Sequence, residues 1–425
     1  MIGKRGRSDR RGRRGRASVR RVVYVLESPL SKRDADRFGL RVLRDAGFEV
    51  HVWNVAPIYL PHSEKQWYEP AADFAVTRLG SKEEFRSACE GLAADDAVIM
   101  MVGVYRGQLH SHMGMLAAVS GTPALLGAVA GAHLPDMAEA ERARRNAGLV
   151  RVTASDTMAS VWGWCRARLS RTVHSHNWLT FAYRHWTKLT TGVRPLDIVW
   201  LGATSVQINP VLIGRETRIE YIHVFDFDLT LGVTRLALED TQELVLIDAM
   251  GPLNPDFVTH GQAFGEYDGG DYFEPLRRIL DEIESESGFS VTIAAHPRAK
   301  PGLLETLYGN RNVVYGSTAK CIGRARAVIL VGPSTALNMA VVMRKPILLV
   351  ARWVYPSEKI ESEILSRLLD FPIIDSRVPL AQWPLLEVNQ DAYDNYMARY
   401  IKRPSTPELP FWQVVANHLH EELLN

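Results

Sequence analysis

The chain has 425 residues, and a prior of roughly one domain per 150 residues favours two or three domains over a single core. An apolar content of 46% with 23% charged residues is ordinary for a folded globular protein, which excludes collagen-like, disordered and disulfide-scaffold classes. The formal net charge is +2, but ten basic side chains and one acid fall within residues 1–21, so the remaining chain carries −7. The composition therefore predicts an acidic body with a basic arm, residues 1–20.

The cysteines and the amino-terminal residues indicate the compartment. Three cysteines lie far apart and form neither a zinc-binding nor a paired spacing, which favours a reducing compartment. No secretory signal is recognisable, because the apolar run Val22–Leu26 that follows the basic start is too short. The uncharged stretch between Arg106 and Asp136 is interrupted by glycines and by Pro123, which favours a buried helix, a loop and a strand over a membrane span. We therefore expect a cytoplasmic protein.

Apolar, β-rich runs alternate with amphipathic helical patterns, which predicts βα units that feed parallel sheets. The series occurs twice, so we predict an α/β chain with two Rossmann-like domains, residues 21–236 and 237–405, joined near Gly232–Thr241. The last segment, 406–425, holds an amphipathic helix at Pro410–Leu424 that we expect to return to the first domain. Strands are expected at Val22–Leu26, Phe48–Val55, Ala97–Val102, Ala124–Leu126, Ile198–Leu201 and Ile219–Phe225, and then at Leu244–Ile247, Val291–Ala295, Asn312–Tyr315, Ala327–Val331 and Pro346–Val350. Helices are expected, among other places, at Asp34–Ala46, Met113–Val119, Pro301–Tyr308, Thr335–Val342 and Ser357–Leu369.

The segment His296-Pro297-Arg298-Ala299-Lys300 follows a buried-looking strand of the second series. In doubly wound sheets, ligands bind outside the carboxyl ends of the strands, which is where this segment begins. The proline ends the strand and leaves His296 at its carboxyl end, where a histidine can donate to a phosphate or act as an acid. Arg298 and Lys300 add positive potential for an anion. The alternative is that His296 only caps a loop.

A second segment, Gly332-Pro333-Ser334-Thr335, follows the strand Ala327–Val331 and precedes a helical run. Free amides at a helix start, two hydroxyls and a flexible glycine suit a phosphate, although an ordinary helix cap uses the same residues. Because both segments follow strands of one predicted sheet, we expect them to open on one crevice and to hold a nucleotide phosphate between them. The cations Arg344 and Lys345 are expected to cluster near this site.

These two segments, together with Arg344-Lys345-Pro346-Ile347, resemble the donor domain of bacterial GT-B glycosyltransferases that act on surface polysaccharides such as capsule and lipopolysaccharide. The similarity is greatest to the CMP-sugar-dependent sialyl-, polysialyl- and Kdo-transferases. The resemblance implies a GT-B fold, in which two Rossmann-like domains face a central cleft. It also implies that His296 contacts the CMP phosphate and assists departure of the leaving group, and that Ser334 and Thr335 bind that phosphate.

The residue that activates the acceptor is not assigned by these motifs. The acidic motif that supplies the base in several sialyltransferases is absent in recognisable form. Three acids follow first-domain strands and are candidate catalytic bases: Glu27, Asp226 and Asp228. Glu27 can equally start a loop, and the two aspartates alternate along a predicted strand and can equally be solvated. Asp248 ends the first strand of the second domain, where it either borders the nucleotide or forms a turn.

Two histidine pairs invite a metal-site hypothesis. His110-Ser111-His112 and His174-Ser175-His176 place imidazoles at i and i+2, which lie on one face of a strand. No carboxylate or cysteine completes either set at a recognised spacing, so structural or surface roles are favoured and no metal or cofactor is expected. Arg106, which follows a strand, is a candidate contact for the acceptor.

The basic arm interleaves Arg and Gly without aromatic residues, so we expect no specific nucleic-acid recognition. An anionic membrane surface can attract residues 4–21, with about 1 kcal/mol for each basic residue near the surface. The alternative is a solubilising tail. We favour peripheral contact with the inner membrane face.

The sequence as a whole predicts a metal-independent GT-B glycosyltransferase that moves a sugar from a CMP-sugar to an oligosaccharide or glycolipid acceptor. Asn338 and Ala340 stand where UDP-sugar enzymes are expected to carry paired acids, which favours cytidine-linked donors. Two alternatives stay open: a CDP-polyol phosphotransferase of the teichoic-acid kind, and a non-catalytic protein of GT-B fold that binds polysaccharide or an assembly partner.

Overall fold

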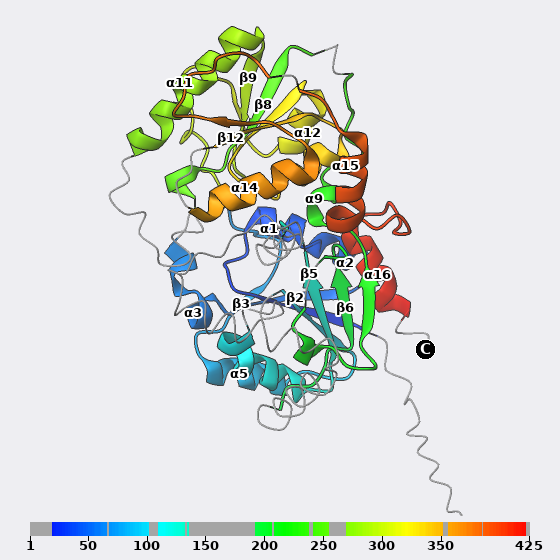
Figure 1. Ribbon diagram of the computed structural model, residues 1–425. Coiled ribbons are helices and arrows are strands. Elements are labelled where there is room, and N and C mark those ends of the chain that lie inside the picture. Colours follow the sequence, from blue (N-terminus) through cyan, green and yellow to red (C-terminus); the bar gives the residue numbers. More distant parts are fainter. Residues whose placement is uncertain are drawn as a thin grey trace, which may run out of the picture.

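The protein consists of two α/β domains, each built on one parallel sheet (Figure 1). The computed structural model describes residues 19–65, 68–101, 109–131, 134–135, 192–205, 208–237, 241–254, 269–351, 356–384 and 386–421. The first domain lies in the lower half of Figure 1 and the second in the upper half. Within these ranges, no helix is both long enough and apolar enough to cross a membrane.

The first sheet has seven parallel strands in the order β3-β2-β1-β4-β5-β6-β7. β1 and β4 are neighbours at the centre, with Val25 opposite Met100. The strands are β1 (Arg21–Leu26), β2 (Glu49–Asn54), β3 (Val76–Arg78), β4 (Asp96–Met100), β5 (Leu125–Ala130), β6 (Ile198–Leu201) and β7 (Arg218–Tyr221).

The second sheet has six parallel strands in the order β10-β9-β8-β11-β12-β13. β8 and β11 are neighbours at its centre, with Ile247 opposite Leu330. The strands are β8 (Glu243–Ile247), β9 (Ser290–Ala294), β10 (Val313–Val314), β11 (Ala327–Val331), β12 (Ile347–Ala351) and β13 (Ile373–Asp375).

Both sheets follow the Rossmann strand order, in which the chain starts in the middle, builds one edge and then crosses over to build the other. Ligands of such sheets bind where the order reverses, which is between β1 and β4 in the first domain and between β8 and β11 in the second. The central strands β4, β5, β11 and β12 are buried along their whole length, because helices cover both faces. The predicted fold class, an α/β chain with two Rossmann-like domains, is confirmed.

The first domain carries its helices between these strands. The expected helix at Asp34–Ala46 is in fact two short helices, because Gly39 adopts φ +57° between them. A Cβ at this glycine would lie 2.1 Å from Cγ of Trp412, so the break leaves room for a side chain from the other end of the protein. The helices are α1 (Lys32–Arg37), α2 (Leu40–Asp45), α3 (Ala56–Tyr59), α4 (Lys82–Glu90), α5 (Leu109–Ser120) and α9 (Phe225–Asp228).

The second domain and the carboxyl-terminal segment carry the remaining α-helices of the described chain. The helix expected at Pro301–Tyr308 is wrong: these residues form turns, with Gly302 at φ +85°. The strand expected at Ile219–Phe225 ends at Tyr221, and its last residue begins α9 instead. The helices are α11 (Gly269–Ser287), α12 (Thr318–Arg324), α13 (Leu337–Val342), α14 (Pro356–Leu369), α15 (Gln390–Tyr396) and α16 (Phe411–Glu421).

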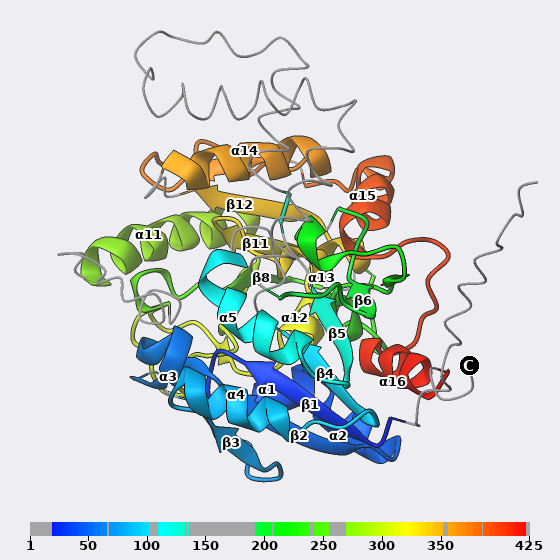
Figure 2. The same cartoon turned by 90° about the horizontal axis from the view of Figure 1, so that it is seen from below.

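Helix α16 leaves the second domain and packs against the first, beside β6 and α2 in both views (Figures 1 and 2). Trp412 is 2% exposed and donates its indole N–H to the carbonyl of Arg37 at 2.8 Å. Asp228 accepts the backbone N–H of Phe411 at 2.9 Å and so caps the start of the helix. The last helix therefore ties the two ends of the described chain together within the first domain.

Candidate functional site

The carboxyl edge of the second sheet brings three predicted site segments together. Ala294 of β9, Ile247 of β8 and Leu330 of β11 lie in one row across the sheet. His296, Asp248 and Gly332 follow these strands within two residues of that row. β9 and β11 are separated by one strand, so their backbones lie about 10 Å apart. Side chains from both segments can reach one phosphate group between them.

Asp248 is a buried anchor for the histidine loop. Its side chain is 2% exposed, and one carboxylate oxygen accepts the Tyr308 hydroxyl at 2.6 Å and the Met250 amide at 2.8 Å. The other oxygen accepts the backbone N–H of His296 at 3.3 Å. Burial raises the pKa of Asp248, and these donors act in the opposite direction. The predicted nucleotide contact thus lies under the loop and positions it.

His296 is half-buried at the sheet edge. Its Nδ1 accepts the backbone N–H of Arg298 at 3.2 Å. In the neutral ring the proton therefore lies on Nε2, which makes Nε2–H the donor that a phosphate can use. Arg298 is half-buried beside it, whereas Pro297 and Lys300 are exposed. The segment predicted for phosphate binding thus combines one oriented N–H donor with two cations.

The turn Gly332–Thr335 follows β11, with Gly332 at φ +79°. The free amides that we expected at the helix start are used inside the turn. Ser334 Oγ accepts the N–H of Ala336 at 3.3 Å, and the amide of Leu337 donates to the carbonyl of Ser334 at 3.2 Å. Donors to a phosphate from this turn are therefore the half-buried hydroxyls of Ser334 and Thr335 and not the amides of α13.

Arg344 and Lys345 do not lie at this site, so their expected clustering there is wrong. They precede β12 and so lie at the amino edge of the sheet, opposite the carboxyl edge that carries His296. Arg344 pairs with Asp394. Lys345 is 1% exposed, and its Nζ donates to the carbonyl of Leu236 at 3.0 Å. Both cations hold the domain join and the last helices in place.

The carboxyl edge of the first sheet holds a histidine–carboxylate pair. Glu27 follows β1, and its carboxylate hydrogen-bonds Nε2 of His112 in α5. The side chains are 14% and 7% exposed. The imidazole stacks on the ring of Tyr59, with centroids 4.8 Å apart, and burial together with the charge of Glu27 raises the pKa of this tyrosine. A carboxylate on Nε2–H fixes the tautomer that carries its lone pair on Nδ1.

The i, i+2 spacing of His110 and His112 predicts a strand and favours a structural or surface role for His112. It lies on helix α5 instead, and its pairing with Glu27 was missed. A signal existed, because Glu27 follows one strand and the histidine helix follows β4, the neighbouring strand across the switch point.

The other two candidate bases occupy α9, at the boundary with the second domain. Asp226 accepts the side-chain amide of Asn338 at 3.3 Å, and burial raises its pKa. Asp228 lies 3.4 Å from Nε2 of buried His223 and caps α16. Burial raises the pKa of Asp228 to about 6, against the attraction of His223. Asp226 therefore joins the domains, and Asp228 holds the last helix.

Some predicted residues lie outside the described chain: Arg106, the pair His174 and His176, the side chain of His110, and residues 1–18 of the arm. No group of three or more metal-ligating side chains occurs among the residues that the structure does describe.

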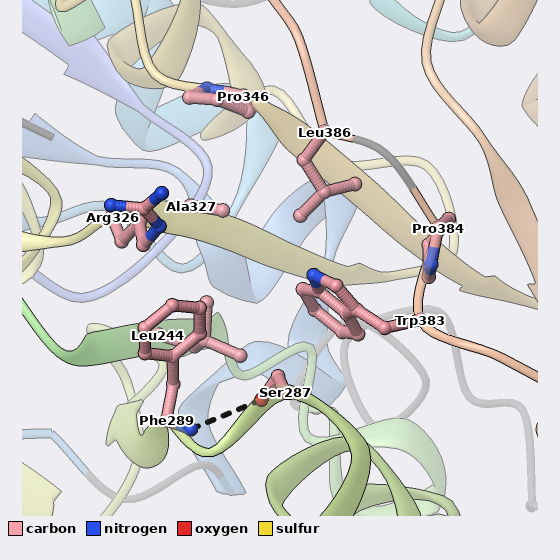
Figure 3. Close-up of a pocket in the computed structure, with 9 residues that line it drawn as sticks. All are labelled: Leu244, Ser287, Phe289, Arg326, Ala327, Pro346, Trp383, Pro384 and Leu386. Carbon is pink, nitrogen blue, oxygen red and sulfur yellow. Dashed lines mark hydrogen bonds between the residues drawn. The ribbon is translucent and has the colours of Figure 1, made fainter. Parts of the chain in front are cut away.

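A cavity of about 410 Å³ opens at the amino edge of the second sheet, away from His296 (Figure 3). Leu244, Ala327 and Pro346 line it from the strand starts, with the Trp383 indole and the Arg326 guanidinium on its walls. The guanidinium lies 5.1 Å from the ring centre of Phe289. This cavity is separate from the carboxyl-edge site.

No protein-family model and no curated protein sequence matches the chain. Among solved structures, it is similar to CalG4, the calicheamicin glycosyltransferase, with a TM-score of 0.43 and 12% identity over 96% of this chain and 94% of that chain. The spinosyn forosaminyltransferase SpnP gives a TM-score of 0.41 and 12% identity over 96% and 95% of the two chains. The glycosyltransferase VinC in complex with dTDP gives 0.39 and 11% over 95% of each.

Proposed function

We propose that the protein is a glycosyltransferase that moves a sugar from a nucleotide-sugar to an acceptor hydroxyl. The observation that carries this proposal is the position of two different sets of groups on facing sheet edges. The first domain offers the Glu27–His112 pair, and the second offers His296 with the hydroxyls of Ser334 and Thr335. The hydrogen bond between Asp226 and Asn338 joins the two domains beside these edges.

The first set suits removal of a proton. The Glu27 carboxylate fixes the tautomer of His112 in which Nδ1 accepts a proton, and it stabilises the imidazolium that forms. The acceptor oxygen attacks the anomeric carbon as its proton passes to Nδ1. The bond from that carbon to the donor phosphate oxygen breaks, and the phosphate takes the electron pair.

The second set suits the departing phosphate. His296 Nε2–H donates to it, and the guanidinium of Arg298 and the Ser334 hydroxyl add a charge and a further donor. Oriented donors and cations can neutralise the leaving group without a metal ion. We therefore propose a metal-independent transfer.

A CMP-sugar is the donor that we propose. The side chains at positions 338 and 340 support this, since neither is a carboxylate that could accept hydrogen bonds from the hydroxyls of a UDP-sugar. Asn338 is 1% exposed and turns to Asp226, and Ala340 is fully buried. The acceptor that we propose is a surface polysaccharide or its lipid-linked precursor, on the basis of the His296 and Ser334 segments.

A panel of donors tests the function: CMP-, UDP- and dTDP-sugars, and CDP-glycerol. Release of free or transferred sugar from a nucleotide-sugar is expected, and it should be lost in His112→Ala. Transfer of phosphoglycerol from CDP-glycerol would support the phosphotransferase alternative. If the protein binds none of these nucleotides, the result would support the alternative of a non-catalytic protein that binds polysaccharide or an assembly partner.

The exposed pair His51–Glu49 supplies a matched control, because it has the same two side chains, 2.6 Å apart, on β2. His51→Ala should leave turnover unchanged. If His51→Ala and His112→Ala reduce turnover equally, the assignment of His112 as the base is wrong.

A further inference from the structure

Tyr59 lies against the histidine of the Glu27–His112 pair. The two rings are stacked, with centroids 4.8 Å apart and planes inclined by 27°. Tyr59 ends helix α3, which follows β2, whereas His112 belongs to α5, which follows β4. Figures 1 and 2 show α3 beside α5 in the first domain. A third segment of the chain therefore contributes a side chain to the group that Glu27 and His112 form.

Helix α3 is short, and hydrogen bonds fix it to the ends of two strands. Asn54, the last residue of β2, is 5% exposed, and its side-chain oxygen accepts the backbone N–H of Ala56 at 2.9 Å. The N–H of Val55 donates to the carbonyl of Leu26, the last residue of β1, at 2.8 Å. The N–H of Tyr59 donates to the carbonyl of Val55 at 3.2 Å. The ring of Tyr59 is thus carried by backbone that is bonded to the sheet.

The residues after α3 hold the loop of Glu27. The 3₁₀ helix η1 (Pro61–Lys65) contains Ser63, which is 3% exposed and donates its hydroxyl to the carbonyl of Glu27 at 3.3 Å. One continuous segment, residues 56–65, therefore contacts both members of the pair: the imidazole through Tyr59, and the backbone of the carboxylate residue through the serine.

The phenol ring can act on the imidazole in two ways. Its face opposes rotation of the imidazole about the Cβ–Cγ bond, and so keeps Nε2–H directed at the Glu27 carboxylate. The same face attracts a cation within about 6 Å of the ring centre, so it stabilises the imidazolium that forms when His112 takes a proton. Because positive charge develops on the imidazole during the transfer, a contact that favours the charged ring lowers the barrier.

We propose that Tyr59 is a positioning residue for the proton transfer: its ring holds the His112 imidazole toward Glu27 and stabilises the imidazolium that forms. This proposal rests on the proposed function, because His112 is the base that we assign there. It adds a group that the sequence motifs did not indicate. The groups that accept the proton and orient the base then follow β1, β2 and β4, the three adjacent strands on one side of the first sheet.

Nitrogen-15 NMR of protein labelled at histidine tests the positioning without any substrate. The signals of His112 are those that disappear in His112→Ala. At a pH where the ring is neutral, wild type should show a protonated Nε2 and an unprotonated Nδ1. In Tyr59→Leu and in Tyr59→Met the two signals should move toward each other, because both tautomers become populated, whereas Tyr59→Phe should keep the wild-type pattern. Tyr68→Leu is the control, since Tyr68 is 39% exposed.

Steady-state kinetics forms the second arm of the test. Tyr59→Leu should lower kcat about tenfold and leave the Michaelis constants of donor and acceptor within twofold, because the ring acts on the base and not on a substrate. The solvent deuterium isotope effect on kcat should rise, since the proton transfer becomes slower. Tyr59→Phe keeps the aromatic face and should restore most of kcat. Thermal unfolding shows that each variant folds.

The outcomes separate this proposal from the proposed function. An unchanged pattern of His112 signals in both Tyr59→Leu and Tyr59→Met would overturn the positioning role, while sugar release by wild type would leave the transferase standing. A rise in the Michaelis constant of the acceptor with kcat unchanged would also overturn it, because Tyr59 would then bind the acceptor. Equal losses of kcat in Tyr59→Leu and Tyr68→Leu would contradict it as well. A changed signal pattern in a protein that releases sugar from no donor would support the positioning of the imidazole and contradict the transferase.

Discussion

His112 and Glu27 lie 85 residues apart in the sequence, and their side chains form one hydrogen-bonded pair at the carboxyl edge of the first sheet. The pair is nearly buried and stacks on Tyr59. A histidine held in this way can take a proton from an acceptor hydroxyl, which His296 is not placed to do, since its Nδ1 is already an acceptor for the backbone. The proposed base and the proposed donor to the phosphate thus lie in different domains.

Glu27→Gln should reduce turnover about 10²-fold, because the amide neither orients the imidazole as a carboxylate does nor stabilises its charged form. The Michaelis constant of the donor should stay near its wild-type value, since Glu27 bonds His112 and is not among the residues proposed to hold the donor phosphate. Steady-state kinetics across pH 5 to 9 measures both effects. Glu49→Gln, in the exposed pair on β2, is the control. An equal rise in the Michaelis constant of the donor would mean that Glu27 binds the donor instead.

The strands of both sheets could be predicted because parallel strands buried on both faces are continuous apolar runs. β11 is Ala327–Val331 and β6 is Ile198–Leu201, as expected from the sequence. β3 and β13 were missed, because each has three residues that are exposed or half-buried and show no apolar run. Edge strands of this length leave almost no periodic signal.

The candidate site was found where it depends on position in the chain and missed where it depends on packing. His296, Asp248 and Gly332 follow strands, and the rule for doubly wound sheets is sufficient to bring them together. The pairing of His112 with Glu27 also requires the orientation of α5, which no local pattern contains. Lys345 is close to Ser334 in the sequence, but it precedes β12 and therefore lies at the opposite edge of the sheet.

Gly39→Ala should destabilise the protein by about 1–3 kcal/mol, since a Cβ there would overlap Trp412 and the residue has a positive φ. Chemical denaturation measures the loss. Gly47→Ala separates the two causes: Gly47 has φ +96° and no atom within 4 Å of the added Cβ, so it reports backbone strain alone. The loss of stability caused by Gly39→Ala should be smaller when it is measured in a Trp412→Ala background. Equal losses of stability for Gly39→Ala and Gly47→Ala would show that contact with Trp412 of α16 does not restrict the side chain at position 39.

The free energy of unfolding should fall as pH rises from about 4 to 6, through the contribution of Asp228. Burial raises the pKa of Asp228 to about 6 in the folded protein, whereas the unfolded chain has the ordinary value of 3.8. The folded state therefore binds the proton more tightly, and its advantage is complete below 3.8 and is lost as pH passes 6. His223, 3.4 Å away, favours the charged carboxylate when it is protonated and so reduces this advantage. A tenfold difference in proton affinity between the two states corresponds to about 1.4 kcal/mol.

Asp228→Asn provides the comparison for this pH effect. Its amide oxygen can still accept the N–H of Phe411 and cap α16, but it cannot titrate. Urea unfolding between pH 4 and 7 should give a flatter dependence for the variant than for wild type. A parallel pH dependence in both proteins would assign the slope to other groups.

Deletion of residues 2–18 should reduce binding to vesicles that contain anionic lipid and leave nucleotide binding unchanged. The deleted segment carries eight of the basic side chains and one acid, whereas Arg298, the cation proposed to hold the phosphate, lies in the second domain. Electrostatic attraction of this kind weakens with salt, so vesicle binding of the full chain should fall steeply between low and physiological ionic strength. Co-sedimentation with phosphatidylserine vesicles and calorimetry with CMP measure the two properties. Loss of CMP affinity in the shortened chain would contradict the proposal that the arm binds membranes and the folded domains bind the nucleotide.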